Sequence, residues 1–430
     1  MKSISARKIS HAYRQVKRRY DRYGISIIQV AFNRLVLRLR TALDNLCYPF
    51  FFNKEDLESL FSSRYEFVDY SAGKLEWNGR LVQRYRQIAT EFSKLDGLVI
   101  SGSLPQVDNV RFVRKISPHH ILINPYIRPL VKDIEKLCSA QTKKVIVRLQ
   151  STDFTFSIED VNRFKEMGFS ILYEYIDPFH ENISGDIPEK IYERHKRILQ
   201  DEGIFVCCTA DALKKEVSIN RANVLLSPNG VNLEHWKSSD KPNKNSAFYK
   251  ELKGRNSHNL PVIGYHGALA KWIDYDLLKK ISKTGDYFLL IIGQQYDDSL
   301  KKSGLLSSQN VFYAGPVDYD FLPQAAQAYD ISIIPFEQSE LSNCVSPIKL
   351  FEYMALGKPI VSTETSEVLK YRSCLVSQTH DGFIKKLEYA LQLKNELWYR
   401  KILNEEARCN SWNARAKQLL AFLKEEQFKV

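Results

Sequence analysis

The 430-residue chain lacks several features that would define a class at once. It has no run of about 18 uninterrupted apolar residues, so we expect no membrane-spanning helix. Its seven cysteines include no C-x-x-C pair and no zinc-type spacing, which excludes a disulfide scaffold and favours a reducing cytosol. Neither G-x-G-x-x-G nor G-x-x-x-x-G-K-[ST] occurs, which excludes a dinucleotide-binding fingerprint and a P-loop. We also expect no signal peptide, because the first apolar stretch, Ile25 to Phe32, is interrupted by Ser26 and Gln29.

Excess positive charge is nearly absent outside the first 50 residues. Residues 1–50 hold eleven Lys or Arg against two Asp, a net of +9 out of the chain's +12, which leaves +3 for the other 380 residues. A nucleic-acid enzyme carries its basic charge around its cleft, so this distribution argues against a nucleic-acid partner. Apolar residues of this segment recur at helical spacing, and its arginines lie largely off that face. The apolar positions are Ile28, Phe32, Leu35, Leu39 and Leu46.

This pattern predicts a basic amphipathic helical segment over residues 1–50, with two interpretations. The helix can lie on an anionic membrane surface, where each basic residue contributes about 1 kcal/mol. Alternatively, its apolar stripe docks on the first domain and the arginines form its solvated face. Both interpretations stay open, and the expected location is cytoplasmic or peripheral on the inner face of the cytoplasmic membrane.

The rest of the chain alternates short apolar runs with segments of helical periodicity, in two halves. In the first half the predicted strands are 97–101, 120–123, 144–149, 169–176, 204–208 and 223–226, and the predicted helices are 81–95, 128–137, 158–167, 189–199 and 210–217. In the second half the predicted strands are 261–265, 287–292, 310–313, 331–335, 359–362 and 374–376, and the predicted helices are 275–281, 319–329, 348–354 and 379–394. A polar stretch, Lys237 to Asn245, separates the halves. This order predicts an α/β chain of two doubly wound, Rossmann-like parallel-sheet domains that face a ligand-binding crevice, over residues 51–240 and 246–410.

The densest motif is SNCVSPIKLFEYMALGKPIV, residues 342 to 361. Pro347 favours a helix start, which leaves the amides of Val345, Ser346 and Ile348 free for an anion such as phosphate. Lys349 adds a cation one turn in, and Glu352 on the same face can accept hydrogen bonds from two ribose hydroxyls. The alternative is an amphipathic helix on which the lysine and the glutamate form a surface pair.

This motif resembles the donor-sugar-binding motif of GT-B glycosyltransferases of family 4. Supporting segments follow the order of that family, namely LLSPNGVNLEHW, PVIGYHGALAKWIDYDLL, LLIIGQQ and NVFYAGPVDYDFLPQAAQAYDISIIPF. The similarity covers residues 65–425 and is strongest over 261–362. It implies a GT-B fold in which the last helix, residues 411–426, crosses back onto the first domain.

The resemblance assigns donor-side roles to individual residues. Glu352 matches the second glutamate of the family's E-x7-E motif and is expected on the ribose. The first glutamate is replaced by Cys344, itself a donor-side candidate, which leaves recognition of the sugar hydroxyls unassigned, with Asn343 and Ser342 as neighbouring candidates.

The diphosphate is expected at Gly267 and at two lysines. The usual arginine of that loop is missing, so Lys271 and Lys349 are predicted to neutralise the charge. Val317 and Gln294 are expected near the base.

Candidates on the acceptor side are weaker. Trp77 can stack on a sugar ring or serve as a core side chain, and Arg80 can meet an anionic acceptor. Asp177, at the predicted carboxyl end of a strand, suits a base or orienting role, with a helix cap as its alternative. His180 and His266 are further candidates, although a lone histidine is more often structural.

The predicted function is transfer of a sugar from a nucleotide-diphosphate sugar to a saccharide or lipid-linked acceptor in cell-surface polysaccharide biosynthesis. No cofactor or metal is expected, and the resemblance implies a retaining reaction. A non-catalytic GT-B scaffold of a polysaccharide assembly complex and a nucleotide-sugar epimerase are the alternatives.

Overall fold

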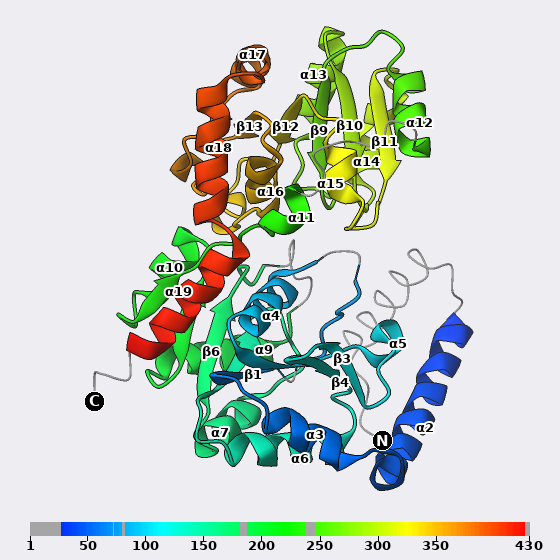
Figure 1. Ribbon diagram of the computed structural model, residues 1–430. Helices are drawn as coiled ribbons and strands as arrows, with labels where there is room; N and C mark the ends of the chain where they lie inside the picture. Colours follow the sequence, from blue (N-terminus) through cyan, green and yellow to red (C-terminus); the bar gives the residue numbers. More distant parts are fainter. Residues whose placement is uncertain (1–26, 72, 80–81, 181–186, 238–245, 426–430) are drawn as a thin grey trace.

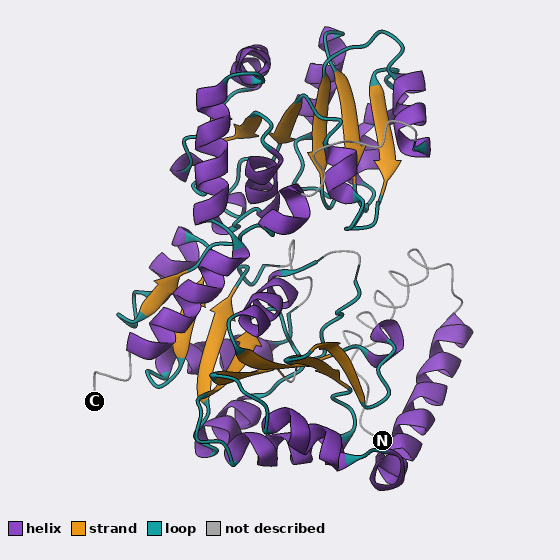
Figure 2. Cartoon of the chain, viewed as in Figure 1, coloured by secondary structure: helices purple, strands orange, loops and turns teal. Residues whose placement is uncertain are grey.

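The computed structural model describes residues 27–71, 73–79, 82–180, 187–237 and 246–425, with side chains from residue 35. Two sheets, one above the other in Figure 1, divide the described chain into two α/β domains. No helix in these ranges is long and apolar enough to cross a bilayer. Figure 2 shows helices on both faces of each sheet.

The first domain is built on an eight-stranded sheet of order β3-β4-β2-β1-β5-β6-β7-β8. All neighbours are parallel except the edge pair β3 and β4. Its strands are β1 (Phe67–Ser71), β2 (Gly97–Gly102), β3 (Val113–Ser117), β4 (His120–Ile123), β5 (Val145–Gln150), β6 (Ser170–Tyr175), β7 (Phe205–Cys208) and β8 (Val224–Leu226). Its helices are α3 (Lys54–Phe61), α4 (Arg84–Lys94), α5 (Pro105–Asp108), α6 (Arg128–Ser139), α7 (Ile158–Glu166), α9 (Glu189–Gln200) and α10 (Asp211–Val217). The next helix, α11 (Leu233–Lys237), packs with the core of the second domain.

The second domain is built on a six-stranded parallel sheet of order β11-β10-β9-β12-β13-β14. Its strands are β9 (Val262–His266), β10 (Phe288–Ile292), β11 (Val311–Gly315), β12 (Ile331–Ile334), β13 (Ile360–Thr363) and β14 (Cys374–Ser377). Its helices are α12 (Ala247–Arg255), α13 (Tyr275–Thr284), α14 (Ser299–Ser303), α15 (Leu322–Ala326), α16 (Ile348–Leu356), α17 (His380–Leu393) and α18 (Leu397–Cys409). The chain reverses its winding direction between β9 and β12, and ligands of such sheets bind beyond the strand ends at that point.

Two chain segments run side by side between the domains. Val231 donates its amide to the carbonyl of Asn410 at 3.1 Å, and Trp412 donates its amide to the carbonyl of Val231 at 3.0 Å. The chain then continues into α19 (Trp412–Glu425), which packs on α4 of the first domain. In Figure 1 this red helix lies against the lower domain.

The predicted fold class of two doubly wound domains is confirmed, with differences in single elements. The sequence does not predict strands β1 and β3 or helices α3, α5, α11, α12, α14 and α18, and α15 is shorter than the predicted helix 319–329. Leu322 begins α15 with Pro323 in its first turn, so Tyr319 stands outside the helix.

The N-terminal helix α2 (Ile27–Phe51) stands along the outer side of the first domain (Figure 1). It docks through a polar face. Asn45 donates to the carbonyl of Tyr126 at 3.0 Å and accepts from the amide of Arg128 at 2.8 Å, while Tyr48 donates to Asp133 at 3.0 Å. The interpretation in which the apolar stripe docks on the domain is therefore wrong for Leu35, Leu39 and Leu46, which are all exposed.

Candidate active site

A cavity of about 270 Å³ lies beyond the carboxyl ends of β9, β10 and β11. Most of its lining comes from the loops after these strands and from the start of α16, and the first domain adds Val82 and Gln83. Of the sequence-predicted site residues it gathers Gly267, Gln294, Val317, Lys349 and Glu352. The cavity therefore lies at the position predicted for the donor.

Two glycines, Gly267 and Gly293, form part of the cavity wall. Gly267 and Gly293 adopt φ of 137° and 145°, which side chains rarely allow. A Cβ on Gly293 would stand 1.7 Å from the carbonyl oxygen of Gly267, and a Cβ on Gly267 would stand 2.9 Å from Cε of Lys349. The backbone can thus approach a ligand closely, with the lysine directly behind it.

Lys349 brings a positive charge into this wall from the first turn of α16. Its ammonium lies 4.7 Å from the ring centre of Phe336 and 5.4 Å from that of Tyr265. Burial lowers the pKa of Lys349 to about 8, an effect that the negative charge of Glu352 opposes. The first amides of the helix also have no intrahelical acceptor, so the site favours an anion.

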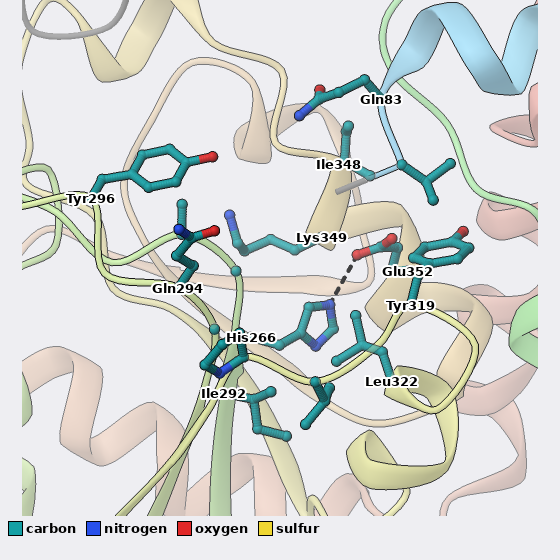
Figure 3. A pocket seen from close by; sticks show the side chains of 16 residues that line it. Gln83, His266, Ile292, Gln294, Tyr296, Tyr319, Leu322, Ile348, Lys349 and Glu352 are labelled. Atoms are coloured by element: carbon teal, nitrogen blue, oxygen red, sulfur yellow. Dashed lines mark hydrogen bonds and ion pairs between the residues drawn. The ribbon is translucent and has the colours of Figure 1, made fainter. Parts of the chain in front are cut away.

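Glu352 lies one turn further along α16 and pairs with His266 at the end of β9. His266 Nε2 and Glu352 Oε2 are 2.9 Å apart, and both side chains are buried (Figure 3). The ring of His266 stacks on Trp236 of α11 with centroids 5.2 Å apart. The histidine thereby fixes one carboxylate oxygen, and the other is available to hydroxyl donors of a ligand.

Tyr319 closes the side of the cavity next to the first domain. Its ring stacks on His235 with centroids 4.1 Å apart, and Gln87 of α4 donates to its hydroxyl at 3.1 Å. This hydrogen bond joins the two domains at the edge of the cavity.

Several predicted donor residues lie outside the cavity lining. Ser346 is buried against the segment between the domains, where its hydroxyl and its carbonyl accept hydrogen bonds from Asn229 at 3.1 and 2.7 Å. Asn343 accepts from the amide of Ser366 at 2.7 Å, and Cys344 packs against the core of the first domain. Neither Asn343 nor Cys344 lines the cavity, and the sugar-binding roles expected for them stay predictions.

Val345 and Lys271 also stand apart from the lining. Lys271 is exposed, and its amide is held by Asp297 at 3.0 Å. Lys271 therefore does not line the cavity, and its contact with a diphosphate stays a prediction.

The acceptor-side residues are dispersed. Trp77 is only 4% exposed and packs edge-on against His120 with centroids 4.6 Å apart, so it is a core side chain and does not offer a sugar-stacking surface. Arg80 lies outside the described residues. Asp177 follows β6, and burial raises its pKa to about 6. His180 is exposed two residues beyond Pro178.

The sequence reading underrated His266 and did not single out Tyr319 or Tyr296, which also line the cavity. His266 is the last residue of β9, and Tyr319 follows Val317 by two positions. The rule that ligands lie beyond strand ends could have found both. Within the described residues, no three His, Cys, Asp or Glu side chains are grouped to hold a metal ion.

Comparisons with known proteins agree with this geometry. Residues 261–392 match the family described as "Glycosyl transferases group 1". The "Putative teichuronic acid biosynthesis glycosyltransferase TuaH" of Bacillus subtilis (strain 168) is 26% identical over 269 residues, which are 59% of this chain and 66% of that relative, just under two thirds of its length.

Solved structures share the fold. Sucrose-phosphate synthase from Thermosynechococcus elongatus superposes with a TM-score of 0.61 at 14% identity, covering 86% of this chain and 100% of the other. Anabaena HepE in complex with UDP and glucose gives a TM-score of 0.59 at 10% identity, covering 84% and 100% of the two chains.

The fold is that of the GT-B class, which these solved structures share. Over residues 261–392 the chain is similar to the glycosyl transferases of group 1. The family resemblance predicted from the sequence is confirmed.

Proposed function

We propose that the chain transfers a sugar from a nucleoside-diphosphate sugar to a saccharide or lipid-linked acceptor in cell-surface polysaccharide biosynthesis. The observation that carries the proposal is the convergence of Lys349, the two-glycine wall and the His266–Glu352 pair on one cavity between the domains. The named role of TuaH in teichuronic acid biosynthesis supports the acceptor class. The UDP in HepE makes UDP sugars the first donors to test.

Each group has a task in this reaction. Lys349 and the first amides of α16 stabilise the negative charge that develops on the departing diphosphate. Glu352, oriented by His266, accepts hydrogen bonds from the ribose hydroxyls. The second domain would hold the nucleotide, and the first domain would present the acceptor across the cavity.

Two finer features belong to the same proposal. We expect the reaction to need no metal, because a lysine and helix amides supply the positive charge near the diphosphate. Retention of configuration at the sugar carbon is implied by the family resemblance, and product stereochemistry by nuclear magnetic resonance would test it.

Asp177 is the candidate for orienting the acceptor from the first domain. Its raised pKa of about 6 leaves it mainly ionised at neutral pH, which suits a weak base. The proposed location is cytoplasmic and peripheral on the inner face of the membrane, where a lipid-linked acceptor is found.

The test is a thermal-shift screen of the full chain against UDP, GDP, CDP, ADP and dTDP, with the sugar conjugate of the best nucleotide. A ligand at a hundredfold excess over its Kd stabilises the protein by about 2.7 kcal/mol. We expect a shift with one nucleotide, and its loss in Glu352→Ala. Lys253→Ala, on the exposed side of α12, is the control and should keep the full shift.

Two outcomes would contradict the proposal. Absence of a shift with every nucleotide would favour a scaffold without donor binding. A shift combined with conversion of the nucleotide sugar into an isomer, and no transfer, would favour an epimerase.

A further inference from the structure

Helix α2 presents a continuous apolar stripe to solvent. Leu35, Leu39, Leu43, Leu46 and Phe50 recur at intervals of four, four, three and four residues, which places them on one helical face. Their exposed fractions lie between 56% and 83%. Soluble proteins rarely expose contiguous apolar patches of this kind unless the patch contacts a partner.

The opposite face of α2 already holds the helix to the domain. Asn45 and Tyr48 make the hydrogen bonds to Tyr126 and Asp133, and the ring of Tyr48 packs edge-on against Phe112 with centroids 5.7 Å apart. Because these contacts fix the rotation of the helix about its axis, the exposed stripe is a property of the docked helix.

Positive charge borders the stripe. Arg38 and Arg40 are exposed and stand on either side of it in the helical projection. Arg111, which pairs with Asp44 at 2.9 Å, lies 5.4 Å above the ring of Phe51 and extends the positive rim. Asp44, the one carboxylate of this helix, pairs with Arg111 and lies 3.9 Å from Arg40, so the three arginines and this carboxylate leave the rim a net charge of +2 (3 − 1).

We propose that this face of α2, the stripe with its arginine rim, is the surface that docks on an anionic lipid leaflet. Leucine and phenylalanine side chains enter the boundary between headgroups and acyl chains, while the guanidinium groups bind lipid phosphates. The inference rests on the proposed membrane location and names its surface and its lipid chemistry. The first domain, which would present the acceptor, would then rest on the membrane through helix α2.

A second copy of the chain fits this face less well. A symmetric contact through the stripe would bring the same patch against itself. The arginine rims would then meet at short distance, and like charges disfavour that contact. The charge of the rim therefore points to an anionic partner.

The experiment is co-sedimentation of the full chain with phosphatidylcholine vesicles, prepared with and without phosphatidylglycerol. We expect binding that needs the anionic lipid and weakens with salt. The double variant Leu39→Glu with Leu46→Glu should lose at least about tenfold in affinity, because each change removes apolar burial and adds repulsion. Arg38→Gln and Arg40→Gln should each cost about fivefold.

The matched control carries the same chemical change elsewhere. Ile219→Glu with Leu397→Glu alters two side chains that are 79% and 80% exposed and lie outside α2, and it should bind vesicles like wild type. All variants should keep the thermal shift with the donor nucleotide, which separates loss of the lipid surface from loss of the donor site.

Three results would overturn the assignment. The first is equal binding of wild type to neutral and anionic vesicles, and the second is equal binding by the α2 double variant and wild type. The third is a dimer of wild type, but not of the α2 double variant, in light scattering, with no vesicle binding by either protein. The last would assign the stripe to a second copy of the chain.

Discussion

The protonation state of Lys349 determines how strongly the cavity binds an anion. Since its pKa is lowered to about 8, the ammonium is protonated at neutral pH and loses its proton as the pH rises through that value. A bound diphosphate favours the charged form, so binding must take up a proton above the free pKa. Nucleotide affinity should therefore fall by up to about tenfold for each pH unit above about 8.

Isothermal titration of the preferred nucleoside diphosphate between about pH 7 and about pH 9 measures this slope. Lys349→Arg stays charged throughout and should show a flat profile with its own, weaker affinity. The same slope in Lys349→Arg and in wild type would assign the pH dependence to another group.

Among the site residues, Lys349 and Glu352 could be predicted from residue type and spacing, because their position on the helix follows from Pro347 and the 3.6-residue period. They did not identify the partner of Glu352. His266 lies 86 positions earlier, and only the register of β9 beside the start of α16 brings the two side chains to 2.9 Å. The same holds for Trp77, which is buried against His120 of β4 and Tyr85 of α4.

Among the elements, strands whose apolar residues dominate were predictable, including β5 and β6 with Arg148 and Glu174, whereas β1 and β3 were not. The central strand β1 was missed because Asp69 breaks its apolar run, and the strand tolerates it because Arg148 on β5 donates to both its oxygens at 2.7 and 2.9 Å. The edge strand β3 (VRKIS) has only two apolar residues, separated by Arg114 and Lys115, and is half-exposed. Helix α2 was predicted as amphipathic, yet its docked face follows from hydrogen bonds that hydrophobic periodicity does not report.

The turn between β10 and Gln294 gives a prediction about an element. Gly293→Ala must place a Cβ 1.7 Å from a backbone oxygen at a φ of 145°, so the loops after β9 and β10 have to separate. We expect a loss of at least about 2 kcal/mol in stability together with weaker nucleotide binding.

Thermal unfolding with and without nucleotide would show both effects. Gly254→Ala in the last turn of α12, where nothing lies within 4 Å of the new Cβ, is the matched control and should raise stability by up to about 1 kcal/mol. A Gly293→Ala protein as stable as the control would show that the loops relax freely.

For the whole molecule, a buried ionic network links the first sheet to the segment between the domains. Glu174 on β6 binds Arg84 and Arg148, and Arg84 also donates to the carbonyl of Pro228 at 3.0 Å and to the hydroxyl of Ser227 at 3.1 Å. The next residue, Asn229, holds Ser346 just before α16. The orientation of the cavity is thus connected to the core of the other domain.

Glu174→Ala would leave two buried arginines short of a counter-charge while their desolvation cost remains. We expect a loss of about 3 to 5 kcal/mol, measured as a lowered thermal transition of the full chain. Glu202→Ala removes the same group from an exposed turn before β7 and should change stability by less than about 0.5 kcal/mol. Equal thermal transitions for the two variants would show that the network contributes nothing to stability.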